Sequence, residues 1–171
     1  MDLKAYLRDV PDFPKPGVLF KDITPLLGDH AAMKECIQRL TKMVFPGQID
    51  KVAAVESRGF LFGMPMALEL GIGFTPIRKR GKLPWKTNRI EYALEYGTDM
   101  LEVHVDGVKK GERVLIVDDV LATGGTMKAA CELIEGVGAK VVGCAFVLEL
   151  VALGGRSKLP NHKVQSLLAI P

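Results

Sequence analysis

Short apolar runs alternate along this chain with segments in which apolar residues recur at helical spacing. An apolar run of about four to eight residues is typical of a strand, whereas a period of about 3.6 residues is typical of a helix. The predicted strands are residues 51–55, 73–78, 114–117, 139–150 and 163–170, and the predicted helices are residues 29–45, the segment that carries Leu61, Met64 and Leu68, and residues 127–137. This alternation predicts a doubly wound α/β sheet, in which ligands bind at the carboxyl ends of the strands.

Two segments depart from the alternation. Residues 2–10 can form a short amphipathic helix, but three prolines within residues 11–16 exclude regular structure after it. The chain is expected to run extended there and to pack irregularly over the domain. Residues 91–97 and 100–105 are predicted to be the two arms of a hairpin. A hairpin beside an anion site is a candidate lid, because the chemistry must be shielded from water while ligands still enter.

The composition indicates one globular domain without membrane or nucleic-acid partners. The chain has 171 residues, of which 48% are hydrophobic and 25% are charged, and no apolar run approaches the length that crosses a membrane. A net charge of +3 is too small to indicate nucleic-acid binding. The three cysteines, Cys36, Cys131 and Cys144, lie inside apolar patterns. Buried thiols fit this arrangement better than disulfides or a metal site, so we expect a cytoplasmic protein.

Residues 113–126 carry the strongest functional pattern. Four consecutive apolar residues, mostly β-branched, predict a strand buried on both faces, and Asp118 and Asp119 follow them. Residues 123–126 are Thr-Gly-Gly-Thr and open the next predicted helix. Unpaired backbone N–H groups, the helix dipole and two threonine hydroxyls converge there on a volume suited to phosphate. Gly124 and Gly125 let the backbone approach the anion closely.

The paired acids decide which ligand fits this pattern. Taken alone, Thr-Gly-Gly-Thr could be an ordinary capped turn, and Asp118 and Asp119 could be solvated acids at a strand end. Adjacent carboxylates would repel a bare phosphate unless a divalent metal or sugar hydroxyls lay between them. A ligand that carries a phosphate, vicinal hydroxyls and Mg²⁺ satisfies every part of the pattern. Neither a Walker A sequence nor G-x-G-x-x-G occurs, so the usual nucleotide cradles are not indicated.

A second turn from strand to helix provides another candidate anion site. Residues 56–59 are Glu-Ser-Arg-Gly and lie between a predicted strand and a predicted helix. Arg58 offers a planar donor fork suited to phosphate, although it could instead pair with a surface acid. A basic segment follows the next strand and could face an anion or form a solvated loop. Its cations are Arg78, Lys79, Arg80, Lys82, Lys86 and Arg89.

Several motifs together resemble the type I phosphoribosyltransferases, and in particular the members that use adenine. They are residues 11–25, 56–60, 78–84, 94–97 and 113–126, in the order that the family shows. The resemblance implies a type I phosphoribosyltransferase-like α/β fold: a mostly parallel twisted sheet of about five strands flanked by helices, with an N-terminal hood and a hairpin lid. It implies a single domain over residues 1–171. The implied reaction transfers the 5-phosphoribosyl group of phosphoribosyl pyrophosphate to adenine, giving AMP and pyrophosphate.

The resemblance assigns roles to particular residues. The residues assigned to the 5-phosphate and ribose are Asp118, Asp119, Ala122, Thr123, Gly124, Gly125 and Thr126. Those assigned to the pyrophosphate are Ser57, Arg58, Lys79 and Lys82, and those assigned to adenine are Leu19, Phe20, Lys21 and Val120. Phe20 is expected to stack on the base, Glu95 to be the acid–base residue, and Tyr96 to help seal the lid. The peptide bond between Glu56 and Ser57 is expected to be cis.

The same resemblance implies a Mg²⁺ cofactor and a homodimer. Mg²⁺ is expected to be held mainly by substrate and water near Asp118 and Asp119, without direct protein ligands. A homodimer is expected, in which residues of the basic lid segment reach across the interface. Two further assigned residues also have ordinary alternative roles. Phe20 could be a core residue, and Glu95 could form a surface salt bridge with one of the lid cations.

Two other functions would use the same fold. A phosphoribosyltransferase for a 6-oxopurine needs differently placed donors at the base edge, and the proline-led segment at residues 11–17 argues against it. A transcriptional regulator that senses phosphoribosyl pyrophosphate needs an added DNA-binding module. The short stretch before Pro11 is expected to leave no room for one.

Overall fold

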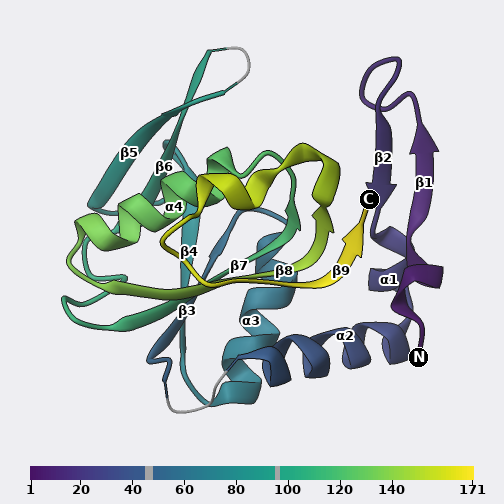
Figure 1. Cartoon of the computed structure of the whole chain (residues 1–171). Helices are drawn as coiled ribbons and strands as arrows, with labels where there is room; N and C mark the ends of the chain where they lie inside the picture. The colour runs from purple at the N-terminus through teal and green to yellow at the C-terminus, as the bar shows by residue number, and fades with distance from the viewer. Residues whose placement is uncertain (45–47, 95–96) are drawn as a thin grey trace. The chain divides into compact units, whose positions relative to one another are not determined.

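The computed structural model describes residues 1–44, 48–94 and 97–171, and the chain divides into two units. The first unit comprises residues 1–39 and the second comprises residues 40–171. Helix α2 (His30–Met43) begins in the first unit and ends in the second. Figure 1 shows the elements of both units. A single domain over residues 1–171 stays a prediction.

The first unit contains a two-stranded antiparallel ribbon. Its elements are η1 (Leu3–Tyr6), β1 (Arg8–Pro11), β2 (Leu19–Asp22), α1 (Thr24–Gly28) and the first part of α2. The strands pair from Arg8 opposite Asp22 to Pro11 opposite Leu19. The helix predicted over residues 2–10 is therefore wrong beyond η1. The prolines begin only at the end of β1, where a missing N–H group does not disrupt the ladder of residues 8–10.

The second unit contains a seven-stranded sheet in the order β5-β6-β4-β3-β7-β8-β9. Its strands are β3 (Lys51–Val55), β4 (Gly73–Lys79), β5 (Thr87–Ala93), β6 (Thr98–His104), β7 (Arg113–Leu121), β8 (Lys140–Leu150) and β9 (Val164–Ile170). Five neighbouring strands pair in parallel, in the order β4-β3-β7-β8-β9, and form the predicted sheet of about five strands. The predicted hairpin, β5–β6, extends that sheet because β6 pairs with the end of β4 at Arg78 and Lys79.

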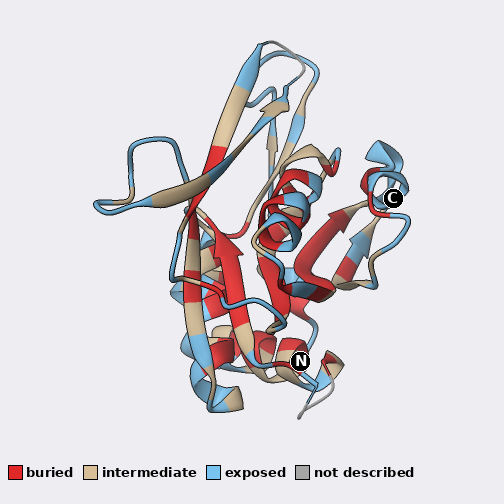
Figure 2. Ribbon diagram, turned by 90° about the vertical axis from the view of Figure 1, so that its left-hand side faces the viewer, coloured by how far each residue is buried: buried red, intermediate tan, exposed pale blue. Residues whose placement is uncertain are grey.

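Helices α3 (Gly59–Leu70) and α4 (Gly125–Gly136) cover opposite faces of the sheet. Alternate residues of β3 face different helices. Ala53 and Val55 belong to the core cluster that α4 joins, whereas Val52 and Ala54 lie against Gly63 of α3. Because both faces are covered, the central strands are apolar along nearly their whole length, and Figure 2 shows the buried residues concentrated there. Each fully buried valine or isoleucine stabilises the fold by roughly 1.5–3 kcal/mol.

The sheet brings the two candidate anion sites to one edge. Strands β3 and β7 are parallel neighbours, with Lys51 opposite Val114 and Ala54 opposite Val117. The segments that follow these strands therefore leave the sheet at the same edge, where α/β folds bind their ligands. Between β8 and β9 lie two short 3₁₀ turns, η2 (Val151–Leu153) and η3 (Gly155–Lys158). None of the helices in the described parts of the chain is long and apolar enough to cross a membrane.

Candidate active site

The predicted phosphate loop connects the end of β7 to the start of α4. Gly124 precedes the helix with φ at 81° and ψ at −3°, a left-handed conformation that glycine adopts without a steric penalty. Directly after it, the first N–H groups of α4 have no acceptor within the helix. A pocket of about 100 Å³ opens beside the loop. Its lining includes the predicted residues Asp118, Val120, Ala122, Thr123, Gly124, Gly125 and Thr126, together with Leu121, Met127 and Phe146.

The two acids at the end of β7 lie in different surroundings. Asp118 is half-buried, and one of its carboxylate oxygens accepts a hydrogen bond of 2.8 Å from the backbone N–H of Asp119. Asp119 is only 4% exposed. Burial, and then the neighbouring charge of Asp119, raise the pKa of Asp118 well above its ordinary value. Burial also raises the pKa of Asp119, although the Arg58 guanidinium opposes that rise. Positive charge brought close to this pair would therefore favour its ionised form.

A divalent cation fits this pair only if other groups complete its coordination. The described residues contain no group of three or more histidine, cysteine, aspartate or glutamate side chains that could hold a metal ion. Asp118 and Asp119 supply carboxylate oxygens, the ligand type that Mg²⁺ prefers. Mg²⁺ commonly keeps several waters and binds through one or two carboxylates plus substrate phosphates. The donor set here suits a metal that arrives with a phosphorylated ligand.

The predicted pyrophosphate loop connects β3 to α3. The peptide bond between Glu56 and Ser57 is cis, so that prediction is confirmed. Arg58 stands at the start of α3, and its Nε lies 2.8 Å from Oδ2 of Asp119. A Cβ atom on Gly59 would lie 2.9 Å from Oδ1 of Asp118, so glycine permits this close approach of α3 to β7. The structure thus joins the two candidate anion sites through one ion pair.

The lysines predicted to contact pyrophosphate lie at the end of β4 and in the segment that follows it. The backbone N–H of Lys79 donates to Oε1 of Glu56 at 2.6 Å, which ties the end of β4 to the pyrophosphate loop. The Nζ of Lys79 lies 3.0 Å from Oδ2 of Asp99 on β6, and the hydrogen bond between these groups raises the pKa of Lys79. Lys82 is exposed in the turn that follows. The structure therefore places Lys79 at this edge of the sheet, with its ammonium paired to Asp99.

Three residues near the site were not predicted from the sequence. Glu56 and Asp99 bind the backbone and the side chain of Lys79, as described above. The hydroxyl of Tyr92 on β5 lies 3.5 Å from Oδ2 of Asp99 on β6, the same carboxylate oxygen that pairs with Lys79. In the sequence, charged Arg89 and Glu91 alternate with Ile90 and Tyr92, a signal that could have identified Tyr92 as inward-facing. The contacts of Asp99 depend on the register of the hairpin, and no local sequence pattern indicates them.

The remaining predicted residues are not brought together by the described parts of the structure. Glu95 and Tyr96 lie outside the described residues, so their roles stay predictions. Leu19, Phe20 and Lys21 belong to β2 of the first unit. There the ring of Phe20 meets that of Phe13 edge to face at 5.1 Å, and Nζ of Lys21 lies 2.6 Å from Oδ1 of Asp9. Recognition of adenine by these residues stays a prediction.

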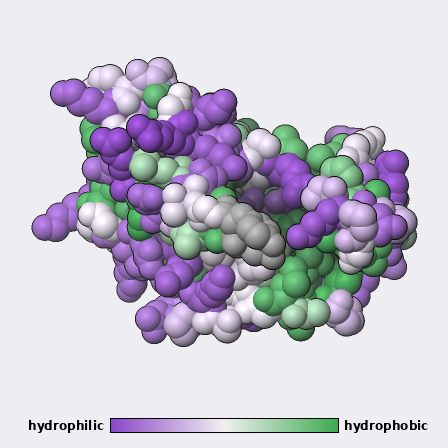
Figure 3. All heavy atoms as spheres, turned by 90° about the horizontal axis from the view of Figure 1, so that it is seen from above, coloured by the Kyte–Doolittle hydropathy of each residue, from purple (hydrophilic) through white to green (hydrophobic). Residues whose placement is uncertain are grey.

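The surface around the hairpin is strongly hydrophilic. Figure 3 shows hydrophilic side chains gathered on the side of the molecule where β5 and β6 lie. The basic segment at residues 78–89 contributes its cations here, and two of them are paired: Arg78 with Glu56 at 3.3 Å and Lys79 with Asp99. Cations beside this edge of the sheet would raise the local concentration of anionic ligands.

Comparison with known proteins gives concordant matches over the whole chain. Residues 26–168 match the family described as phosphoribosyl transferase domain. The chain is 55% identical to adenine phosphoribosyltransferase of Acetivibrio thermocellus over 169 residues, which cover 98% of this chain and 99% of that protein. It is 54% identical to the adenine phosphoribosyltransferase of Kosmotoga olearia over 168 residues, with the same coverage of both chains.

Solved structures of adenine phosphoribosyltransferases share the fold. The structure is similar to that of the enzyme from Thermoanaerobacter pseudethanolicus, with a TM-score of 0.96, 50% identity and coverage of 99% of this chain and 98% of that one. It is also similar to the Saccharomyces cerevisiae enzyme complexed with an imino-altritol bisphosphate and adenine. That match has a TM-score of 0.91, 42% identity and coverage of 97% and 96%.

Proposed function

We propose a reaction on the premise that this chain belongs to the adenine phosphoribosyltransferases, a group within the phosphoribosyl transferase family. The chain transfers the 5-phosphoribosyl group of phosphoribosyl pyrophosphate to adenine in purine salvage. A bond forms between N9 of adenine and the anomeric carbon, the bond from that carbon to the pyrophosphate oxygen breaks, and the N9 proton leaves. The observation that carries the proposal is the pair of strand-to-helix turns at one sheet edge, joined by Arg58 and Asp119.

The two turns suit the two phosphorylated ends of one donor molecule. Residues 122–126 surround the pocket before α4 and would bind the 5-phosphate through backbone N–H groups and threonine hydroxyls. Ser57, Arg58, Lys79 and Lys82 would bind the pyrophosphate. Arg58 now pairs with Asp119, and a donor between them would give both charged groups new partners. No protein nucleophile is needed, because N9 of adenine is the nucleophile. The two turns then contribute to catalysis by positioning the donor and by neutralising the leaving pyrophosphate.

A direct assay tests this function and its dependence on magnesium. AMP should form from adenine, phosphoribosyl pyrophosphate and Mg²⁺, whereas hypoxanthine and guanine should be poor substrates. Removal of Mg²⁺ with a chelator should lower the rate at least about tenfold, because bound Mg²⁺ neutralises charge on the pyrophosphate end of the donor. Asp118 and Asp119 would hold it through its water shell. Restored activity on adding excess Mg²⁺ serves as the control, and an unchanged rate in chelator would contradict the cofactor assignment.

The adenine site is proposed to include Leu19, Phe20 and Lys21 of strand β2. Phe20→Ala should raise the KM for adenine by an amount equivalent to about 1–3 kcal/mol, because an aromatic face that stacks on a base contributes on that order. The KM for phosphoribosyl pyrophosphate is the internal control and should stay unchanged. A fall in melting temperature with an unchanged KM for adenine would show that Phe20 serves only in packing, as its contact with Phe13 allows.

A homodimer in the cytoplasm completes the proposal. Helix α3 exposes an apolar stripe formed by Leu61, Met64 and Leu68, with exposed fractions of 43%, 46% and 73%. These positions lie on one side of the helix, and a stripe of this kind is commonly covered by a partner. Light scattering should give twice the chain mass of 18.6 kDa. A monomeric mass at assay concentration, with full activity, would contradict the dimer.

The three cysteines are free buried thiols, which suits the proposed reducing, cytoplasmic compartment.

A further inference from the structure

The phosphate loop rests against a turn that follows β8. Gly124 and Gly155 are both buried, and a Cβ atom on Gly124 would lie 3.1 Å from Cα of Gly155 and closer still to its carbonyl oxygen. A Cβ atom on Gly155 would lie 2.8 Å from Cδ1 of Leu121 and would press on the carbonyl oxygen of Ala122. The two backbones are therefore in direct contact. The pocket of the 5-phosphate lies along the same stretch of the loop.

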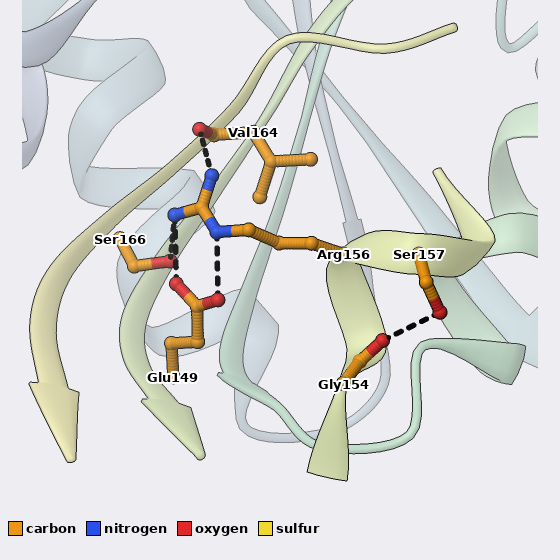
Figure 4. A network of polar contacts seen from close by, with 6 residues as sticks. All are labelled: Glu149, Gly154, Arg156, Ser157, Val164 and Ser166. Atoms are coloured by element: carbon orange, nitrogen blue, oxygen red, sulfur yellow. Dashed lines mark hydrogen bonds and ion pairs between the residues drawn. The ribbon is translucent and has the colours of Figure 1, made fainter. Parts of the chain in front are cut away.

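The turn is held in place by Arg156, the residue after Gly155. Its guanidinium donates to both carboxylate oxygens of Glu149, from Nε and Nη2, at 2.7 Å each. Nη1 donates to the carbonyl oxygen of Val164 on β9 at 2.8 Å, and Nη2 reaches Oγ of Ser166 at 3.4 Å. Figure 4 shows this network. One side chain thus fastens the turn to the ends of two strands.

Glu149 is placed where it can fix the turn relative to the loop. It is 6% exposed, and it lies opposite Leu121, the last residue of β7 before the phosphate loop. Hydrogen bonds from Arg156 hold the pKa of Glu149 below its ordinary value, so the carboxylate stays charged. A bidentate pair between planar groups fixes orientation as well as distance. Glu149 lies on β8, which pairs with β7, and β7 leads into the phosphate loop. The position of Gly155 is therefore fixed relative to that loop.

We propose that Arg156, held by Glu149, is a positioning residue for the 5-phosphate: acting through Gly155, it fixes the backbone of residues 122–126 around the anion. This inference rests on the proposed function, because it takes the pocket to be the site of the 5-phosphate. Hydrogen-bond donors lose most of their value when they are displaced by about 1 Å, so a loop that binds phosphate through backbone groups needs such support. Arg156 itself does not line that pocket.

The test compares two ligands that each carry one end of the donor. Arg156→Gln should weaken the binding of ribose 5-phosphate at least about tenfold in calorimetry while leaving that of inorganic pyrophosphate within about twofold of the parent. In the assay, the KM for phosphoribosyl pyrophosphate should rise and the KM for adenine should not. Arg156→Lys keeps the charge but cannot make the bidentate pair, so it should restore only part of the affinity.

A matched control separates positioning from the general loss of an ion pair. Arg113 makes a similar two-pronged pair with Asp50, at 2.8 and 3.0 Å, at the opposite end of β7. Arg113→Gln should leave the binding of ribose 5-phosphate unchanged. If Arg156→Gln does not fold, Arg156→Lys carries the test. The inference is overturned by unchanged binding of ribose 5-phosphate, or by equal losses for both ligands. Absence of AMP formation by the parent chain would instead refute the proposed function, and the binding test would still apply.

Discussion

An alanine at position 124 is expected to raise the KM for phosphoribosyl pyrophosphate at least about tenfold, a loss of about 1.4 kcal/mol or more. Gly124 has φ at 81°, and an L-residue in the left-handed region costs roughly 1–2 kcal/mol. The added methyl would also collide with the backbone of Gly155, which is buried and cannot easily move. The loop would shift, and the backbone donors proposed to surround the 5-phosphate would shift with it.

The measurement for Gly124→Ala is the KM for each substrate together with the melting temperature. Gly136→Ala is a matched control, because it changes a glycine of α4 at whose Cβ position no atom lies within 4 Å. That control should keep both KM values and should not lower the melting temperature, since alanine is favoured over glycine in a helix by roughly 1 kcal/mol. A Gly124→Ala protein with the parent KM for phosphoribosyl pyrophosphate would refute the placement of the phosphate.

Glu95→Gln should lower kcat at least about tenfold with little change in melting temperature, since a general base contributes on the order of 10² to 10⁴ in rate. Adenine must lose its N9 proton as the new bond forms. Asp118 and Asp119 are occupied with the proposed ribose and metal, so the hairpin is the expected source of a base. Glutamine keeps the shape and the hydrogen bonding of the side chain but cannot accept the proton.

The design of this test must isolate the chemical step. Single-turnover experiments measure the rate of AMP formation when product release would otherwise limit turnover. Glu91→Gln is the matched control, because Glu91 is an exposed carboxylate on β5 of the same hairpin. It removes the same charge and should leave kcat within about twofold of the parent. If Glu95→Gln also stays within that range in single turnovers, Glu95 is a surface charge and not the base.

Several elements could be predicted because their signals are local. The run of β-branched residues in β7, the two acids and the Thr-Gly-Gly-Thr turn lie within a few residues of one another, and the helix begins where the pattern indicates. Asp29 directly precedes α2, and its carboxylate caps the helix by accepting a hydrogen bond of 2.8 Å from the N–H of Ala32. Such features depend on propensity and short-range hydrogen bonds, which a sequence displays directly.

The N-terminal segment shows where local reasoning fails. Apolar residues between positions 3 and 10 fit a helical period, yet residues 8–11 form a strand. A short amphipathic pattern is compatible with either element, and the partner strand β2, which decides between them, follows after an intervening loop. The strand count differs for a similar reason. The hairpin was predicted, but its addition to the main sheet depends on two residues at the end of β4.

The sequence by itself determined the order of the strands and helices in the second unit, the two candidate anion sites and, through family resemblance, the reaction. Only the tertiary structure decided which charged groups meet: Arg58 with Asp119, Lys79 with Asp99, and Arg156 with Glu149. It also decided that Gly124 rests on Gly155. Some of these contacts join segments that are distant in the chain, and the others depend on the exact orientation of two side chains. They follow from strand order and register, which the packing of the whole core selects and no local pattern specifies.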